Sequence, residues 1–227
     1  EATPSSSVSE TPTTSPIDRF IEQFNLETNW VSNEIVRRES TSERGTALSY
    51  FIQLAKKCME LRNLSSTMAI FSALNSASVT RLKYSWNEMA LQMWKLYGNL
   101  EVTLSMENNY KKLRRMMFQM QPPIVPFLGI MTQDMTFIED GNKDLTEEGL
   151  INWQKNAMFA SAIKNISRMQ QDQYGFTSDP KVRRYIVENS SRGLDEKALY
   201  DESLKNEPRN LPTTSASGSS TLRGTRS

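Results

Sequence analysis

The stretch P-P-I-V-P-F-L-G-I-M-T-Q-D-M-T-F-I-E-D-G-N-K-D, from Pro122 to Asp144, determines how the rest of the chain is interpreted. Each of its three prolines lacks an N–H and biases the preceding residue toward extended backbone, so a helix is forbidden before about Pro126. Pro126 itself suits the first turn of a new helix. We expect that helix to run to about Asp140 and to stop at the Gly-Asn pair that follows, because these residue types accept the left-handed conformation of a helix end.

The expected helix has two unlike faces when its residues are placed at 100° intervals around an axis. One face is an apolar stripe that consists of Met131, Met135 and Ile138, with Phe127 beside it. The opposite face is small and polar and consists of Gly129, Gln133, Thr136 and Asp140. The helix therefore presents one face to a core and leaves the other free.

Two acids, Glu139 and Asp140, fall at the C-terminal end of this helix. The helix dipole makes an acid there unfavourable by roughly 0.3–1 kcal/mol. Local violations of this kind are more expected at functional sites than in scaffold. The polar face is therefore the first candidate for a functional surface, and an ordinary capped surface helix is the alternative.

Four other segments accompany this stretch. They are N-W-V-S-N-E-I-V (Asn29–Val36), F-I-Q-L-A-K-K-C-M-E-L-R-N-L-S-S (Phe51–Ser66), A-I-F-S-A-L-N-S-A-S-V-T-R-L (Ala69–Leu82) and L-Y-D-E-S-L-K-N-E-P-R (Leu199–Arg209). Together the five segments resemble, in the family's own order, the catalytic domain of Ras-family guanine nucleotide exchange factors of the Son-of-sevenless type. The resemblance extends over most of the chain.

The composition restricts the classes of protein to consider. With 227 residues, of which 37% are apolar, the chain can bury one sizeable core in one or two domains. The 27 basic and 26 acidic residues nearly cancel, which gives no argument for nucleic acid or an anionic membrane as a partner. No apolar run approaches the roughly 20 residues of a membrane span, so we expect no direct insertion into a membrane.

Several kinds of chemistry are also excluded by composition. Histidine is absent, which removes His-dependent triads and the commonest zinc ligand. Cys58 is the single cysteine, and its apolar helical surroundings favour a buried structural thiol over a nucleophile. The sequence contains no glycine-rich phosphate loop, so nothing indicates that this chain binds a nucleotide itself. We expect no cofactor and no metal.

Apolar residues recur at helical spacing along most of the chain, and strand-period alternation is nearly absent. We therefore expect an all-α fold, a single domain of about ten helices, and the resemblance implies that a helical hairpin protrudes from it. Residues 1–15 are rich in Ser, Thr and Pro and are expected to be a disordered linker. The domain should occupy residues 16–209, and residues 210–227 should be a disordered tail.

Local signals predict individual helix starts. Ser15-Pro16 is expected to begin the first helix, and a separate second helix should carry Trp30 to Val36. Thr146 is expected to cap a helix of roughly 25 residues. The family's early helix, which braces the hairpin, has no counterpart before Ile17, so we expect the domain to be incomplete at its N-terminal side.

The resemblance implies a mechanism without covalent chemistry on the protein. Exchange factors of this family bind the nucleotide-free GTPase, and the first helix of the hairpin opens the first switch and occludes the magnesium and phosphate sites. On this chain the position near the magnesium site falls on Thr136, and the acid near the phosphate site falls on Asp140. Gln133 on the same polar face and Asn142 at its end complete the expected catalytic set.

The resemblance also places a surface for the second switch of the GTPase. The matching positions are Met68, Asn75, Tyr110 and Phe127, with Asn75 as the expected hydrogen-bonding anchor. Taken alone, Asn75 is equally well interpreted as a helix cap. Met68 and Phe127 are by themselves typical core residues, and only the resemblance favours a binding role for them.

The chain differs from the family at positions on which exchange depends. Asp140 is one methylene shorter than the common Glu, and Asn156 and Ala157 replace two bases. The leading hypothesis is a cytoplasmic exchange factor for a Ras-like GTPase, of Ras or Rap type, that acts at membranes carrying the lipidated GTPase. The alternative is a GTPase-binding module with weak or no exchange activity. A helical enzyme that uses Glu139 and Asp140 is a third hypothesis, although no spaced third ligand accompanies them.

Overall fold

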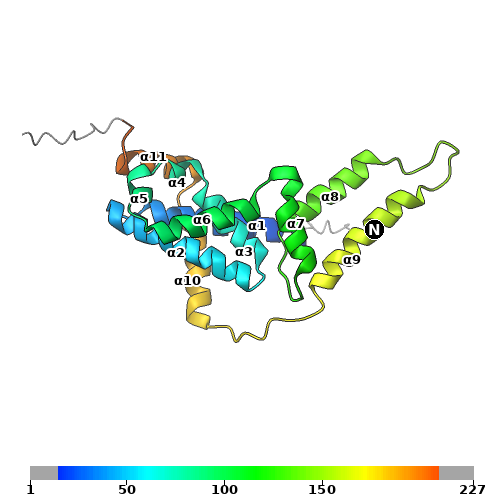
Figure 1. Ribbon diagram of the computed structural model, residues 1–227, viewed down its shortest axis with the longest axis horizontal. Coiled ribbons are helices and arrows are strands. Elements are labelled where there is room, and N and C mark those ends of the chain that lie inside the picture. Colours follow the sequence, from blue (N-terminus) through cyan, green and yellow to red (C-terminus); the bar gives the residue numbers. More distant parts are fainter. Residues whose placement is uncertain (1–14, 210–227) are drawn as a thin grey trace, which may run out of the picture.

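Eleven helices account for most of residues 15–209, the part of the chain that the computed structural model describes (Figure 1). They are α1 (Pro16–Val36), α2 (Thr41–Glu60), α3 (Leu64–Leu74), α4 (Ala77–Thr80), α5 (Lys83–Asn87), α6 (Leu91–Leu104), α7 (Glu107–Gln119), α8 (Leu128–Gly141), α9 (Trp153–Met169), α10 (Pro180–Ser190) and α11 (Glu196–Asn206). The expected all-α class is confirmed, with eleven helices against about ten expected. The expected linker and tail lie outside the described residues, except for Ser15.

Six of the eleven helices in residues 15–209 have a side-chain cap at their N-terminal end. Ser15 and Ser40 each form a capping box, in which the serine hydroxyl accepts the backbone N–H of the acid three residues later and that acid accepts the serine N–H. Side chains also cap four further helices, those of Asn63 for α3, Asn152 for α9, Asp179 for α10 and Asp195 for α11. These starts are therefore fixed by local hydrogen bonds that the sequence already contains.

The expected separate second helix is wrong. The first helix continues unbroken from Pro16 to Val36, so Trp30 and the residues after it belong to α1. No glycine or proline interrupts residues 17–36, and the polar Thr28 hydroxyl donates to the Phe24 carbonyl at 2.9 Å inside the helix. Nothing in this stretch provides a reason for the helix to stop.

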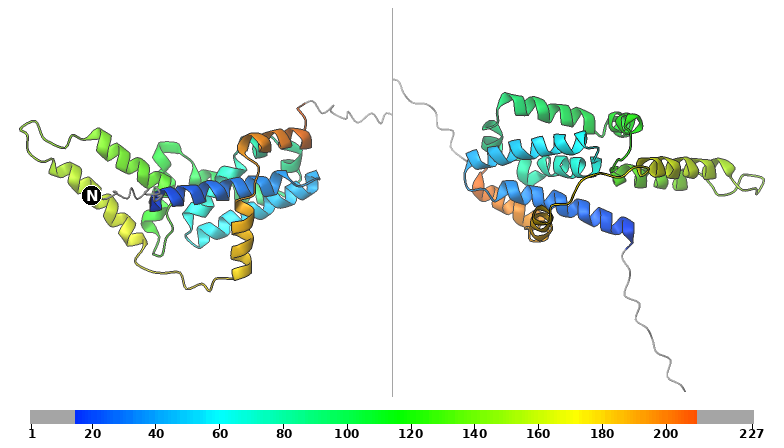
Figure 2. Two further views of the ribbon diagram at one scale, coloured as in Figure 1. Left: turned by 180° about the vertical axis from the view of Figure 1, so that it is seen from behind. Right: turned by 90° about the horizontal axis from the view of Figure 1, so that it is seen from below.

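The core lies where α1, α2 and α3 pack against one another. Helices α5 and α6 pack against α2, while α11 packs against α1 and α4 (Figure 2). Fully buried side chains from the first three helices include Ile35, Leu48, Ile52, Leu64 and Leu74. Each such burial contributes roughly 1.5–3 kcal/mol, so this helical body is the stable platform of the molecule.

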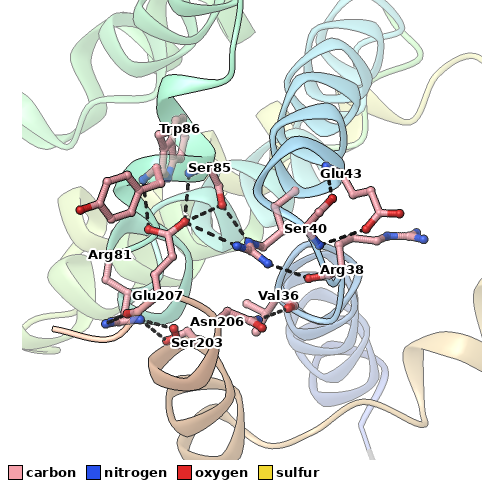
Figure 3. A network of polar contacts seen from close by, with 12 residues as sticks. Val36, Arg38, Ser40, Glu43, Arg81, Ser85, Trp86, Ser203, Asn206 and Glu207 are labelled. Atoms are coloured by element: carbon pink, nitrogen blue, oxygen red, sulfur yellow. Dashed lines mark hydrogen bonds and ion pairs between the residues drawn. The ribbon is translucent and has the colours of Figure 1, made fainter. Parts of the chain in front are cut away.

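A buried carboxylate joins the C-terminal end of α11 to the body (Figure 3). Glu207 is 4% exposed, and its carboxylate accepts hydrogen bonds from the backbone N–H groups of Tyr84 and Ser85, both at 3.0 Å. The Ser85 hydroxyl donates to the same carboxylate at 2.7 Å. Because each polar atom taken out of water needs such partners, these bonds fix the end of α11 against α5.

Arg44 of α2 completes this buried network. Its side chain is 2% exposed and lies 3.7 Å from the Glu207 carboxylate. Its Nε donates to the Ser85 hydroxyl at 2.8 Å, and its Nη1 donates to the carbonyls of Arg38 and Glu39. We call Arg44, Ser85 and Glu207 the Glu207 network. It connects α2, α5 and the residues after α1 and α11 at one point.

The proline-rich stretch before α8 is extended, and the expected helix start at Pro126 is wrong. Phe127 is the N-cap, with φ −77° and ψ 107°, and Leu128 is the first helical residue. Val125 explains the shift, because its N–H donates to the Arg62 carbonyl at 3.0 Å and its carbonyl accepts the Leu64 N–H at 2.8 Å. These long-range bonds hold the backbone extended until after Pro126.

Helices α8 and α9 project together from the body beside α7, joined by residues 142–152 (Figures 1 and 2). The expected cap at Thr146 is wrong. The chain turns at Gly149, which has φ +74°. Leu145 and Ile151 form a single antiparallel bridge, so the two halves of the loop lie side by side and run in opposite directions. Helix α9 begins only at Trp153, where the Asn152 side chain accepts the Lys155 N–H, and it has 17 residues.

Lys155 connects the parts of the hairpin tip. Its side chain is 6% exposed, and its ammonium group lies 2.6 Å from the Asp144 carboxylate and 3.0 Å from the Glu139 carboxylate. The hydrogen bonds to Asp144 and to Glu139 raise the pKa of Lys155. The lysine therefore neutralises Glu139, one of the two acids that the dipole of α8 disfavours, and joins α8, the loop and α9.

Removing the Glu207 carboxylate should destabilise the body. Glu207→Ala leaves Arg44 buried without its counter-charge, which typically costs about 3–5 kcal/mol. Thermal unfolding followed by circular dichroism measures the loss. Glu202→Ala is the matched control, because Glu202 pairs with the exposed Lys205 and such pairs contribute about 0–1 kcal/mol. Equal stability of the two variants would contradict this account.

Removing the Lys155 ammonium should loosen the tip without unfolding the body. In Lys155→Met the Asp144 and Glu139 carboxylates lose the cation between them, so amide hydrogen exchange should accelerate in residues 142–152 and stay unchanged in α1 to α3. Lys164→Met, on the exposed face of α9, is the control. Unchanged exchange at the tip would show that Lys155 does not order it.

Candidate functional site

Three consecutive residues at the start of α7 adopt left-handed backbone. Asn108, Asn109 and Tyr110 have φ of 49°, 56° and 57°. Asparagine visits this region readily, but a bulky tyrosine there is an outlier. Strained residues persist only where their surroundings hold them, and they cluster at functional sites. Helical spacing does not predict this turn, and the Asn108-Asn109 pair is the sequence signal that indicates it.

A shallow groove of about 530 Å³ lies between this turn and α8. We call it the α7/α8 groove. Its walls are formed by Met106, Asn109, Tyr110, Phe127, Gly129, Gln133 and Phe137. Three residues predicted from the sequence, Tyr110, Phe127 and Gln133, thus meet in one depression although they come from two elements.

Phe127 holds the floor of the α7/α8 groove in place. Its ring centroid lies 6.1 Å from that of Tyr110 in an edge arrangement and 5.5 Å from that of Phe24 in α1. Gly129 is required for this packing, because a Cβ at that position would lie 2.4 Å from the Phe127 ring. The groove is therefore built on an aromatic cluster that links α1, α7 and α8.

Thr136 and Asp140 are exposed and stand one turn apart on α8, as the sequence predicts. The Thr136 hydroxyl donates to the Thr132 carbonyl at 3.1 Å. No hydrogen bond or ion pair within residues 15–209 engages the Asp140 carboxylate, in contrast to its neighbour Glu139. A free carboxylate on a projecting helix is available to another molecule.

The fourth residue of the expected catalytic set has a local role. Asn142 follows the last residue of α8, and its side-chain amide donates to the Ile138 carbonyl at 2.9 Å. This bond satisfies one of the carbonyls that a helix end leaves without a partner. Its backbone is extended, with φ −136°, so the expected left-handed stop at the Gly-Asn pair is not formed there.

Met68 and Asn75 lie on α3 and do not line the α7/α8 groove. Met68 is 5% exposed in the core, so it offers little surface to a partner as it stands. Asn75 caps the end of α3, its amide donating to the Phe71 carbonyl at 2.9 Å and its oxygen accepting the Tyr97 hydroxyl at 3.0 Å. Both have defined structural positions, and a binding role for them stays a prediction.

Other chemistry finds little support in the described residues. Within residues 15–209 no group of three or more Cys, Asp or Glu is placed to hold a metal ion. Burial, with a smaller effect of the Glu27 charge, raises the pKa of Cys58 to about 11, so its thiol stays protonated at neutral pH. Over the same range no helix is long and apolar enough to cross a membrane.

The chain is similar in sequence to known guanine nucleotide exchange factors. The family model for the RasGEF domain matches residues 3–157. The chain is 35% identical over 197 residues to Ras-specific guanine nucleotide-releasing factor 1 of Mus musculus, which covers 87% of this chain and 16% of that protein. It is 36% identical over 188 residues to Ras-specific guanine nucleotide-releasing factor 2 of Rattus norvegicus, covering 83% and 16%.

A relative from a distant organism agrees with these two. The chain is 35% identical over 195 residues to Ras guanine nucleotide exchange factor D of Dictyostelium discoideum, which covers 86% of this chain and 29% of that protein. The chain thus spans only a minor part of the length of the curated relatives it matches. The domain match and these identities together show that the chain belongs to the RasGEF domain family.

Proposed function

We propose that residues 16–209 form a catalytic region that promotes GDP release from a Ras-like small GTPase. The observation that carries this proposal is the adjacency of two surfaces on α8, an aromatic groove at its start and a free, exposed Thr136–Asp140 face farther along. The aromatic groove is suited to binding a partner protein. The Thr136–Asp140 face is suited to displacing charged groups, such as a bound phosphate, from that partner. Membership of the RasGEF domain family and the names of the relatives support the same function.

Exchange requires no covalent step on this chain. Small GTPases can hold nucleotide near picomolar dissociation constants, which corresponds to roughly 16 kcal/mol of binding free energy. An exchange factor that binds the nucleotide-free state weakens nucleotide binding by the same factor by which nucleotide weakens its own binding. The interface that supplies this energy should be large, above about 2,000 Å² in total.

The α7/α8 groove is the proposed contact for the second switch of the GTPase. Tyr110 and Phe127 present aromatic surface there, and buried aromatic side chains dominate the energetics of many interfaces. Gln133 adds a polar group to the same depression. Met68 and Asn75 extend the proposed contact surface onto α3, where Asn75 would have to exchange its present hydrogen bonds for bonds to the partner.

The exposed face of α8 is the proposed wedge under the first switch. Thr136 would occupy the region of the magnesium site, and Asp140 would direct its carboxylate toward the phosphate site. A negative charge close to bound phosphates lowers their affinity by Coulomb repulsion, and the effect grows when water is excluded. Asn142 keeps the end of α8 closed, so the wedge retains its helical form up to Asp140.

Contacts within the described chain support exchange over simple binding. The base of α8 is held by Phe127 between Phe24 and Tyr110, and its far end is held by Lys155. Helix α8 is therefore braced at two points by contacts within residues 15–209. The changed positions Asn156 and Ala157 are exposed on α9 and keep the binding-module alternative open to test.

We propose that the partner is a GTPase of Ras or Rap type and that the chain binds it preferentially in its nucleotide-free form. We propose that exchange takes place at membranes to which the lipidated GTPase is anchored. The relatives whose names include Ras make Ras the first protein to test. The likeness to the Son-of-sevenless type within the family stays a prediction.

Release of a fluorescent GDP analogue from Ras and Rap proteins tests the function. Micromolar amounts of the chain should accelerate release from at least one of them, and Asp140→Lys or Thr136→Trp should reduce that acceleration by about tenfold or more, because each perturbs only the proposed wedge. Asp172→Lys, in the exposed segment after α9, is the control for Asp140→Lys.

The two hypotheses predict different outcomes in the same assay. Stable capture of a nucleotide-free GTPase without accelerated release would establish the binding module instead. If the unaltered chain is active and the Asp140→Lys and Thr136→Trp variants accelerate GDP release from the GTPase to the same rate, the assignment of the α8 face is wrong. Unchanged circular dichroism confirms that both variants are folded.

A second variant tests the groove separately from the wedge. Gly129→Ala places a methyl group against the Phe127 ring, so the ring must move and the groove changes shape. Affinity for the nucleotide-free GTPase, measured by biolayer interferometry, should fall by about tenfold. Gly98→Ala is the control, because a Cβ there meets no atom within 4 Å. Equal affinities would show that Phe127 does not shape the contact.

A further inference from the structure

Arg114 of α7 connects the two walls of the α7/α8 groove without lining the groove itself. Its Nε donates to the Asn109 carbonyl at 2.8 Å, and its Nη2 donates to the Asn109 side-chain oxygen at 3.2 Å. Its Nη1 and Nη2 also donate to the two carboxylate oxygens of Asp134 in α8, at 2.6 and 2.7 Å. One guanidinium thus holds the left-handed turn and the hairpin helix at the same time.

This ion pair differs from the other charged contacts of the described chain. Arg114 and Asp134 form the only ion pair in residues 15–209 that has two parallel N–H···O bonds, and their side chains are 28% and 32% exposed. Planar bidentate pairs fix orientation as well as distance, which a lysine or a single bond does not. The contact is therefore suited to setting the angle between α7 and α8.

The location of the pair leaves the proposed binding surfaces free. Arg114 and Asp134 line a second depression of about 510 Å³, enclosed by α7, α8 and α9. Asp134 projects from the side of α8 that carries Met131 and Ile138, away from the Thr136–Asp140 face. A partner in the α7/α8 groove can therefore be bound without contacting either residue.

The pair also connects residues with separate proposed tasks. Asn109 precedes Tyr110, which forms one wall of the groove, and Asp134 follows Gln133, which forms the other. Asp134 lies two residues before Thr136 on the same helix. The turn that carries Tyr110 and the helix that carries Thr136 are therefore joined directly by the bonds of Arg114 to Asn109 and Asp134.

We propose that Arg114 is a positioning residue for nucleotide release. Its bidentate bond to Asp134 couples the turn that contacts the GTPase to the helix that enters it, so that binding in the groove holds α8 at the angle needed to open the nucleotide site. This inference rests on the proposed exchange function and adds to it a residue that touches neither GTPase switch.

Two variants separate coupling from general stability. Asp134→Ala removes the bond to α8 but leaves the bonds from Arg114 to Asn109, whereas Arg114→Met removes both sets. Leu113 and Met117 on the same helix remain buried in each variant, so α7 should stay packed. Arg115→Met is the matched control, because Arg115 is exposed on the same helix.

The readout is GDP release at saturating and at limiting concentrations of the chain. Asp134→Ala should lower the maximal rate by at least about tenfold while the half-saturating concentration changes by less than about threefold. Arg114→Met should affect both quantities, since the turn also loses its support. A maximal rate equal to that of Arg115→Met, or a loss that only parallels a lower melting temperature, would overturn the proposal.

A measurement without GTPase keeps this test independent of the proposed function. Spin labels at Glu107→Cys and Lys143→Cys, in a Cys58→Ser background, report the distance between the start of α7 and the first residues of the loop that follows α8. Asp134→Ala should broaden that distance distribution, and an unchanged distribution would overturn the coupling. If the unaltered chain releases no GDP from any GTPase, the exchange function fails, while the spin-label result still decides whether Arg114 positions α8.

Discussion

Backbone hydrogen bonds at Ile124 and Val125 determine where the hairpin leaves the body. Val125 exchanges bonds with Arg62 and Leu64, and the Ile124 N–H donates to the Met169 carbonyl at 3.0 Å. The first pair of bonds fixes the segment before α8, and the third fixes the end of α9 at the same place. Because the neighbouring prolines cannot form helix there, the backbone is free to make these contacts. A projecting element transmits force only if its base is fixed, and these bonds fix both of its ends.

The body behind this junction is held by a different kind of contact. The Glu207 network closes the end of α11 onto α2 and α5 through a buried charge, with an additional bond from the Asn206 side chain to the Val36 carbonyl at 2.6 Å. A buried pair of this type contributes little net stability over an apolar replacement, but the bonds from Tyr84 and Ser85 fix the orientation of the Glu207 carboxylate. The consequence is a defined position for the end of α11 on the body.

Local chemistry predicted some of these features and could not predict others. Ser15 and Asn63 cap the helices that they precede, because a cap depends on atoms three residues away. The unlike faces of α8 also follow from spacing alone. The start of α8 depends on the hydrogen bond between the Val125 carbonyl and the Leu64 N–H. The start of α9 depends on the pairing of Leu145 with Ile151, and the charge of Glu139 is balanced by Lys155. Leu64 and Lys155 are distant in sequence from the residues that they hold, and the Leu145–Ile151 pairing closes a loop that no capping pattern indicates.

Capture of a GTPase and exchange of its nucleotide make different demands on the contacts of α8. In the proposed mechanism, capture rests on the aromatic surface at Tyr110 and Phe127, and a loosely attached hairpin would not prevent it. Exchange requires that binding energy in the groove be expressed at the nucleotide site, because linkage allows no other source for the work of release. In the proposed mechanism, the contacts of Phe24, Arg114 and Lys155 hold α8 without belonging to either proposed binding surface. Under that proposal, exchange requires both the Asp140 carboxylate and a rigid attachment of the helix that carries it.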